Sequence, residues 1–154
     1  MLYSASPSAL ERWVLPSLEV VTVGLPFCVF KLLTGAIALA SPPLAPLGYA
    51  LLALGAVDAV LNLGNLLALL TVQRRISGVC LTDITLRALG RTERPDLGLA
   101  LDVFLSFALV AIVVGFGLLA RLPSGTLMLW NLSVVLNVLG AGIGRLVTAL
   151  RKPA

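Results

Sequence analysis

The amino-acid sequence predicts an all-α integral membrane protein in which four transmembrane helices form two antiparallel hairpins that pack as a bundle. Hydrophobic residues make up 59% of the 154 residues and charged residues only 12%, and the mean hydropathy is +1.06. These values lie well outside the composition of soluble domains. The apolar residues also gather in stretches of about 20 residues or more, the length that a helix needs to cross a bilayer.

Four apolar stretches reach this length, and short proline-rich breaks join them in pairs. One break lies at Pro42-Pro43 and the other at Pro123-Ser124-Gly125, so each pair is predicted to be a hairpin with a short turn. The middle connection, residues 73–96, is longer and polar, and residues 82–90 within it could form a short basic helix on the membrane surface. The whole chain, residues 1–154, is treated as a single membrane domain. The predicted spans cover residues 14–40, 47–72, 97–120 and 126–150.

Two prolines predict bends in the first span. Pro16 and Pro26 each lack a backbone N–H, and a membrane helix tolerates such a gap where neighbouring groups satisfy the freed carbonyl. Thr92 and the acidic residues that follow it predict the start of the third span.

The distribution of lysine and arginine predicts both termini in the cytoplasm, because positive charge is retained on that side. With the N-terminus inside, Arg121 is the one basic residue clearly placed outside. Lys31 lies within the first span, and its long side chain is expected to snorkel toward the outer surface. The cytoplasmic side then holds Arg12, Arg74, Arg75, Arg87, Arg91, Arg94, Arg145, Arg151 and Lys152.

The lack of common catalytic residues in the sequence indicates a protein that is not an enzyme. The sequence has no histidine, and its two cysteines, Cys28 and Cys80, are far apart, which excludes histidine-ligated metals, histidine-based triads and CxxC redox chemistry. We therefore expect no cofactor and no metal site. The net charge of +4 comes from basic residues at the ends of the apolar segments, which indicates contact with anionic lipid headgroups and no binding of nucleic acid.

Polar residues inside the predicted spans form the candidate site. A charged residue at membrane depth is costly unless it is paired or hydrated, and Asp58, Asn62 and Asn65 recur at i, i+4 and i+7, which places them on one helical face. The bundle is predicted to turn such faces inward, either as hydrogen-bonded packing or as a hydrated site. The predicted seam contains Glu19, Asp58, Asn62, Asn65, Asp102 and Asn137, with Asp58 and Asn137 near the middle of the membrane.

Small and basic residues complete the predicted contacts. Gly55-xxx-Ala59 and Gly140-xxx-Gly144 are predicted helix-packing faces, because small residues allow helices to approach closely in a membrane. Predicted headgroup contacts are Arg74, Arg75 and Arg145, and Arg145 was also expected to reach Asp102 or Glu19.

Three functions are consistent with this pattern. The favoured hypothesis is a non-enzymatic membrane subunit or scaffold that packs against other membrane proteins or against further copies of itself. The second is a small oligomeric transporter or channel, with Asp58 as its carboxylate site. The third is an enzyme acting on a lipid, with Arg74, Arg75 and Arg145 as candidate headgroup or phosphate contacts and no identifiable nucleophile.

The charge count yields a topology prediction. Reporters fused before Met1, within residues 82–94 and after Ala154 should all report the cytoplasm, whereas reporters near Pro43 or Ser124 should report the opposite side. A reporter at Arg91 that is found outside would contradict this topology.

Overall fold

The computed structural model describes residues 13–76, 81–90 and 96–151, and within these ranges all regular structure is helical. The all-α prediction is confirmed. The elements in order are α1 (Leu15–Glu19), the π-helical η2 (Val20–Gly24), α2 (Leu25–Leu39), the 3-10 turn η3 (Pro42–Leu44), α3 (Ala45–Val72), α4 (Leu81–Ala88), α5 (Asp96–Gly115), the 3-10 turn η4 (Leu118–Arg121) and α6 (Ser124–Arg151).

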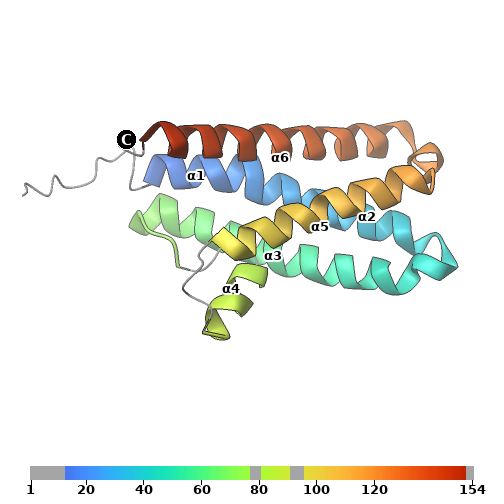
Figure 1. Ribbon diagram of the computed structural model, residues 1–154, viewed down its shortest axis with the longest axis horizontal. Helices are drawn as coiled ribbons and strands as arrows, with labels where there is room; N and C mark the ends of the chain where they lie inside the picture. The colour runs from blue at the N-terminus through green and yellow to red at the C-terminus, as the bar shows by residue number, and fades with distance from the viewer. Residues whose placement is uncertain (1–12, 77–80, 91–95, 152–154) are drawn as a thin grey trace, which may run out of the picture.

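The long helices alternate in direction along one axis (Figure 1). The rod formed by α1, η2 and α2 packs against α3 on one side and α6 on the other, while α5 crosses over α2. Both hairpin turns lie at one end of the molecule, and the start of α1 and the ends of α3 and α6 lie at the other. The short helix α4 runs across the long axis of the bundle.

Within the part of the chain that the structure describes, two helical segments are long and apolar enough to cross a membrane, where the sequence predicts four. They are Leu15–Leu39, with 25 residues, and Pro42–Val72, with 31 residues. In the third predicted span, α5 has 20 residues and ends at Gly115, before a reversal at Gly117 with φ 61°. In the fourth predicted span, the described residues include a shorter apolar segment, Ser124–Gly140, and the helix α6 itself continues to Arg151. Length and apolar composition alone also fit the core helices of soluble proteins.

A hydrophobic core joins α2 to the second hairpin. Phe30 and Trp130 lie with their ring centroids 5.7 Å apart, and the indole N–H of Trp130 donates to Thr34 Oγ1 at 3.2 Å. The polar edge of the buried ring is therefore satisfied within the core. The core contains Phe27, Phe30, Ile37, Leu51, Leu109, Val113, Leu118 and Trp130.

A π-helical turn stands where Pro16 and Pro26 predict bends. Because Pro26 has no N–H, the carbonyl of Thr22 lacks the donor it would have four residues later in an α-helix. This carbonyl faces α6 at Gly140, where an added Cβ would lie 2.8 Å from the Thr22 oxygen and 2.7 Å from a methyl group of Val23. Gly140 thus allows α6 to approach the backbone of η2 closely.

A matched pair of glycines in α6 tests this close approach. Gly140→Ala should lower the free energy of unfolding by about 1 to 3 kcal/mol, because the new methyl group meets backbone. A Cβ on Gly142 meets nothing within 4 Å, so Gly142→Ala should stabilise the helix by up to about 1 kcal/mol. Reversible unfolding in mixed detergent micelles measures both. Equal effects of the two substitutions would contradict the packing described here.

Candidate functional site

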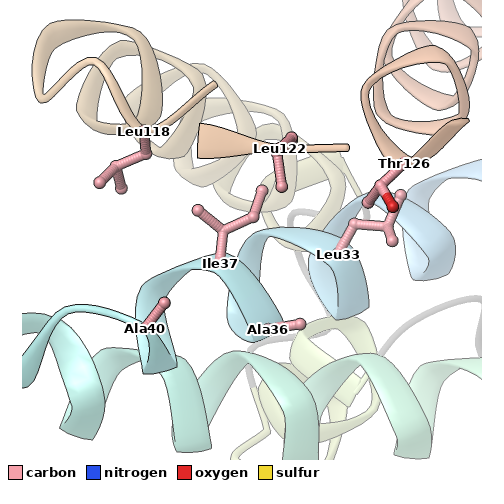
Figure 2. A pocket seen from close by; sticks show the side chains of 7 residues that line it. All are labelled: Leu33, Ala36, Ile37, Ala40, Leu118, Leu122 and Thr126. Atoms are coloured by element: carbon pink, nitrogen blue, oxygen red, sulfur yellow. The ribbon is translucent and has the colours of Figure 1, made fainter. Parts of the chain in front are cut away.

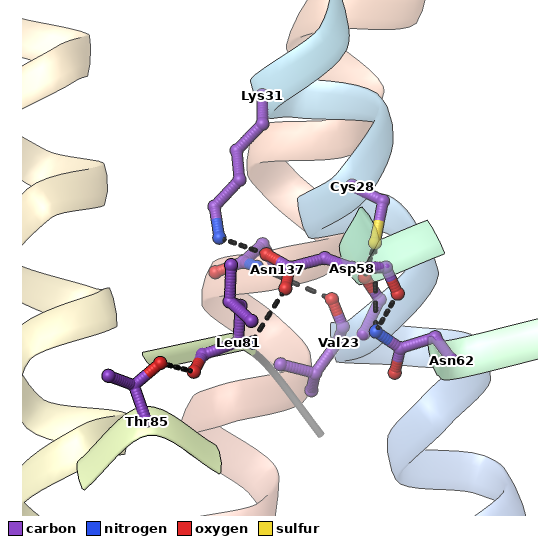
Figure 3. A network of polar contacts seen from close by, with 9 residues as sticks. Val23, Cys28, Lys31, Asp58, Asn62, Leu81, Thr85 and Asn137 are labelled. Carbon is purple, nitrogen blue, oxygen red and sulfur yellow. Dashed lines mark hydrogen bonds and ion pairs between the residues drawn. The ribbon is translucent and has the colours of Figure 1, made fainter. Parts of the chain in front are cut away.

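Asp58 in α3 lies at the centre of a buried polar network between α2 and α3 (Figure 3). Lys31 of α2 donates from Nζ to Asp58 Oδ2 at 2.6 Å, and the exposed fractions of the two residues are 5% and 2%. The same ammonium group lies 4.0 Å from the ring centroid of Phe27, within the range of a cation–π interaction. The positive and negative charges therefore neutralise each other inside the helical packing.

The second carboxylate oxygen of Asp58 binds the start of α4. Its Oδ1 accepts the backbone N–H of Leu81, the first residue of α4, at 2.8 Å. The first N–H groups of a helix have no partner within the helix, and the positive end of the helix dipole favours a carboxylate there. Asp58 thus acts as a tertiary N-cap and joins α2, α3 and α4 through one side chain.

Asn62 extends the network by one turn of α3. Its Nδ2 donates to the carbonyl of Asp58 at 2.8 Å and contacts Cys28 Sγ at 3.6 Å, and the Cys28 thiol donates to the carbonyl of Gly24 at 3.1 Å. A Cβ on Gly24 would lie only 2.2 Å from Asn62 Oδ1. The side chain of Asn62 therefore occupies space that exists because residue 24 has no side chain.

Asn65 binds the chain that returns after α3. Gln73 adopts a left-handed conformation, with φ 57°, and the backbone N–H of Ile76 then donates to Asn65 Oδ1 at 3.2 Å. The three residues that the helical spacing placed on one face are all buried, and two of them accept hydrogen bonds from backbone that lies beyond α3.

The other predicted seam residues lie elsewhere. Glu19 pairs with Arg75, which also donates to the carbonyl of Pro16 at 3.4 Å. Arg75 therefore joins the chain after α3 to α1. Asn137 was predicted at the same depth as Asp58, and its Nδ2 lies 3.5 Å from the carbonyl of Val23. The surroundings of Asp102, Gly144 and Arg145 lie outside the described residues.

The predicted packing residues have different surroundings. Gly55 lies against Leu32, where a Cβ would come within 3.0 Å of a side-chain carbon, and Ala59 is half-buried. Gly140 packs on η2 as described above. Arg74 is exposed.

Lys31 is the principal residue that the sequence reasoning missed. It does not snorkel, because Asp58 holds its ammonium group inside the bundle. The signal was present in the spacing: counted from Leu44 in the turn, Lys31 lies 13 residues before and Asp58 lies 14 residues after. Residues at equal distances from a tight turn lie at the same level of an antiparallel hairpin, and opposite charges in membrane helices pair with each other.

A separate apolar cavity lies near the hairpin turns (Figure 2). It has a volume of about 180 Å³, and no residue of the Asp58 network contributes to its lining. Among the described residues, no group of three or more His, Cys, Asp and Glu side chains could hold a metal ion. The cavity is lined by Leu33, Ala36, Ile37, Ala40, Leu118, Leu122 and Thr126.

Comparisons with protein-family models, with curated proteins and with solved structures give no match to this chain. A buried ammonium–carboxylate pair, a capped helix and two buried amides can hold four segments of chain in one arrangement.

The ion pair can be tested by a double-mutant cycle. Lys31→Met leaves a buried carboxylate and Asp58→Leu a buried ammonium, so each should lower the free energy of unfolding by about 3 to 5 kcal/mol. The double variant should lose less than the sum of the two, because neither charge is then left alone.

Unfolding in mixed detergent micelles measures the cycle, and Arg74→Met provides the control. Arg74 is exposed, so its replacement should change stability by no more than about 0.5 kcal/mol. Additive effects at Lys31 and Asp58 would contradict a direct pair.

Proposed function

We propose that the protein is a non-enzymatic membrane subunit or scaffold, in which four spanning helices form a bundle that packs against partner membrane proteins. The observation that carries this proposal is that the hydrogen-bonding capacity of the Asp58 carboxylate is used within the chain. Both of its carboxylate oxygens bind groups of the same chain, Lys31 and the backbone of Leu81. A polar side chain that is used in this way stabilises the arrangement of helices.

The outer faces of the helices support insertion in a membrane. Large apolar side chains on α3 point away from the bundle, and the exposed fraction of Val60 reaches 71%. Exposed apolar faces of this extent mark contact with lipid or with another protein. On α3 and α6 these residues include Tyr49, Val60, Leu63, Leu67, Leu70, Met128, Leu132, Val135, Leu139 and Ile143.

The arrangement of the long helices supports four spans. The helices alternate in direction, and both short turns lie at the end opposite the C-terminal ends of α3 and α6 (Figure 1). The α6 helix contains 28 residues, or about 42 Å at 1.5 Å per residue, more than the hydrocarbon core of about 30 Å. Among the described residues, Arg74 and Arg75 follow the end of α3, and Arg145 and Arg151 belong to the last turns of α6. This excess of basic residues at the end opposite the turns supports a cytoplasmic location for both termini.

A transporter or channel is the second candidate, and the buried Lys31–Asp58 pair is the observation that favours it, since charges at membrane depth commonly mark ion or proton pathways. Flux measurements in proteoliposomes separate the two functions. A transporter should lose flux when Asp58 is replaced by Asn, whereas a scaffold should show no solute flux before or after the change.

The scaffold function predicts a complex of defined stoichiometry in which one outer face is occupied. Tagged protein extracted from its own membrane in mild detergent should appear by native mass spectrometry as an oligomer or a hetero-complex. Val60→Trp on α3 and Leu139→Trp on α6 alter two exposed positions. The substitution on the partner-contacting face should reduce the recovered complex severalfold, because a bulky ring disrupts close helix packing.

The other tryptophan variant is the matched control, because a lipid-facing position accepts a large apolar side chain. Recovery of the protein solely as a monomer, with a folded bundle and no partner, would refute the scaffold proposal.

A further inference from the structure

The helix α4 differs from the other helices in direction and in composition. It runs across the long axis of the bundle (Figure 1), and in its eight residues, LTDITLRA, Leu81, Ile84 and Ala88 recur at i, i+3 and i+7, the spacing of one helical face. Leu81 and Ile84 are half-buried, whereas Leu89, just beyond the helix, is 70% exposed. A helix that lies across the bundle with an apolar and a polar side is typical of the membrane–water interface.

The cap on Asp58 fixes the level at which α4 begins. Asp58 lies 13 residues after Ala45, the first residue of α3, or about 20 Å along the helix axis. If the hydrocarbon core of about 30 Å begins near Ala45, Asp58 lies about 10 Å below the opposite surface. Interfacial helices bury their apolar side about 5 to 10 Å into this boundary. The level set by the cap therefore matches that of an interfacial helix.

The charge around α4 indicates which surface it meets. Residues 73–96 contain five arginines against three acidic residues. Arg75 is paired with Glu19, which leaves four arginines, and Arg74 among them is exposed at the end of α3. Each basic residue near an anionic bilayer surface strengthens binding, and lipids with anionic headgroups supply the complementary charge.

We propose that α4 is an interfacial helix that binds the anionic cytoplasmic surface of the bilayer, and that Asp58 fixes its depth as a tertiary N-cap. This inference rests on the membrane insertion of the proposed function and adds a ligand class, anionic lipid headgroups. The polar network then has a second consequence: the ion pair with Lys31 orients the carboxylate that holds α4.

Fluorescent labels at two exposed positions test the depth of α4. Single cysteines replace Leu89, beyond α4, and Val60, on the outer face of α3, in a Cys80→Ser background that keeps the buried Cys28. The protein is reconstituted in phosphatidylcholine vesicles with or without phosphatidylglycerol, and quenching by brominated lipid is compared with quenching by aqueous acrylamide. The Leu89→Cys label should be quenched by both agents, and the Val60→Cys label by brominated lipid alone.

The two labels separate failure of this inference from failure of the proposed function. A Val60→Cys label open to acrylamide would overturn membrane insertion itself. A lipid-quenched Val60→Cys label together with a Leu89→Cys label open only to acrylamide would overturn the interfacial helix alone. Phosphatidylglycerol should raise lipid quenching at Leu89→Cys, and equal quenching in the two membranes would overturn recognition of anionic headgroups.

The cap is tested by substitutions at Leu81 that leave the spanning helices unchanged. Leu81→Pro removes the N–H that Asp58 accepts, and proline is well tolerated at the first position of a helix. Leu81→Ala retains this N–H and is the matched control. Leu81→Pro should increase acrylamide quenching at the Leu89→Cys label, with the Val60→Cys label unchanged as a measure of intact folding. Identical quenching in the two Leu81 variants would overturn the role of Asp58 as the cap.

Discussion

The arrangement of the helices depends on the carboxylate of Asp58, which has to be satisfied in a place that water does not reach. Lys31 supplies the opposite charge, and the first N–H of α4 occupies the remaining oxygen. A carboxylate buried without such partners would destabilise the fold by several kcal/mol. Because the two groups come from different segments, satisfying one side chain also determines how α2 and α4 lie against α3.

The buried amide side chains of α3, Asn62 and Asn65, form hydrogen bonds with backbone groups in the same way. Asn65 accepts the backbone N–H of Ile76. Asn62 donates to the carbonyl of Asp58 in its own helix, and its side chain fills the space beside Gly24. Within a bilayer, backbone outside a regular helix is tolerated where protein groups satisfy it. The polar face of α3 therefore serves as a set of acceptors for the chain that follows α3, in addition to its contacts with neighbouring helices. Gly140 of α6 has no side chain, and this allows α6 to approach the backbone of η2 closely.

The sequence predicted features that depend on composition and on local spacing. The helical content, the short turns near Pro43 and Ser124, the helix within residues 82–90 and the common face of Asp58, Asn62 and Asn65 all follow from patterns within one segment. The partners of these residues depend on how the segments rotate about their axes, which composition does not encode. Asn137 lies against the carbonyl of Val23, which belongs to the π-helical turn, and the cap at Leu81 joins residues 23 positions apart. Of the four predicted spans, the described residues contain two helical segments that meet the length and hydropathy needed to cross a membrane.

The turn between α2 and α3 has a constrained length, although it lies outside the packed core. Turns of this kind ordinarily accept insertions and deletions, since they lie outside the packed core. Here Lys31 and Asp58 meet because the two helices leave the turn in one register. Adding or removing a single residue between Ala40 and Ala45 would rotate α3 by about 100° relative to α2 and carry the carboxylate away from the ammonium group. The turn has a defined length because a charge pair four helical turns away requires it.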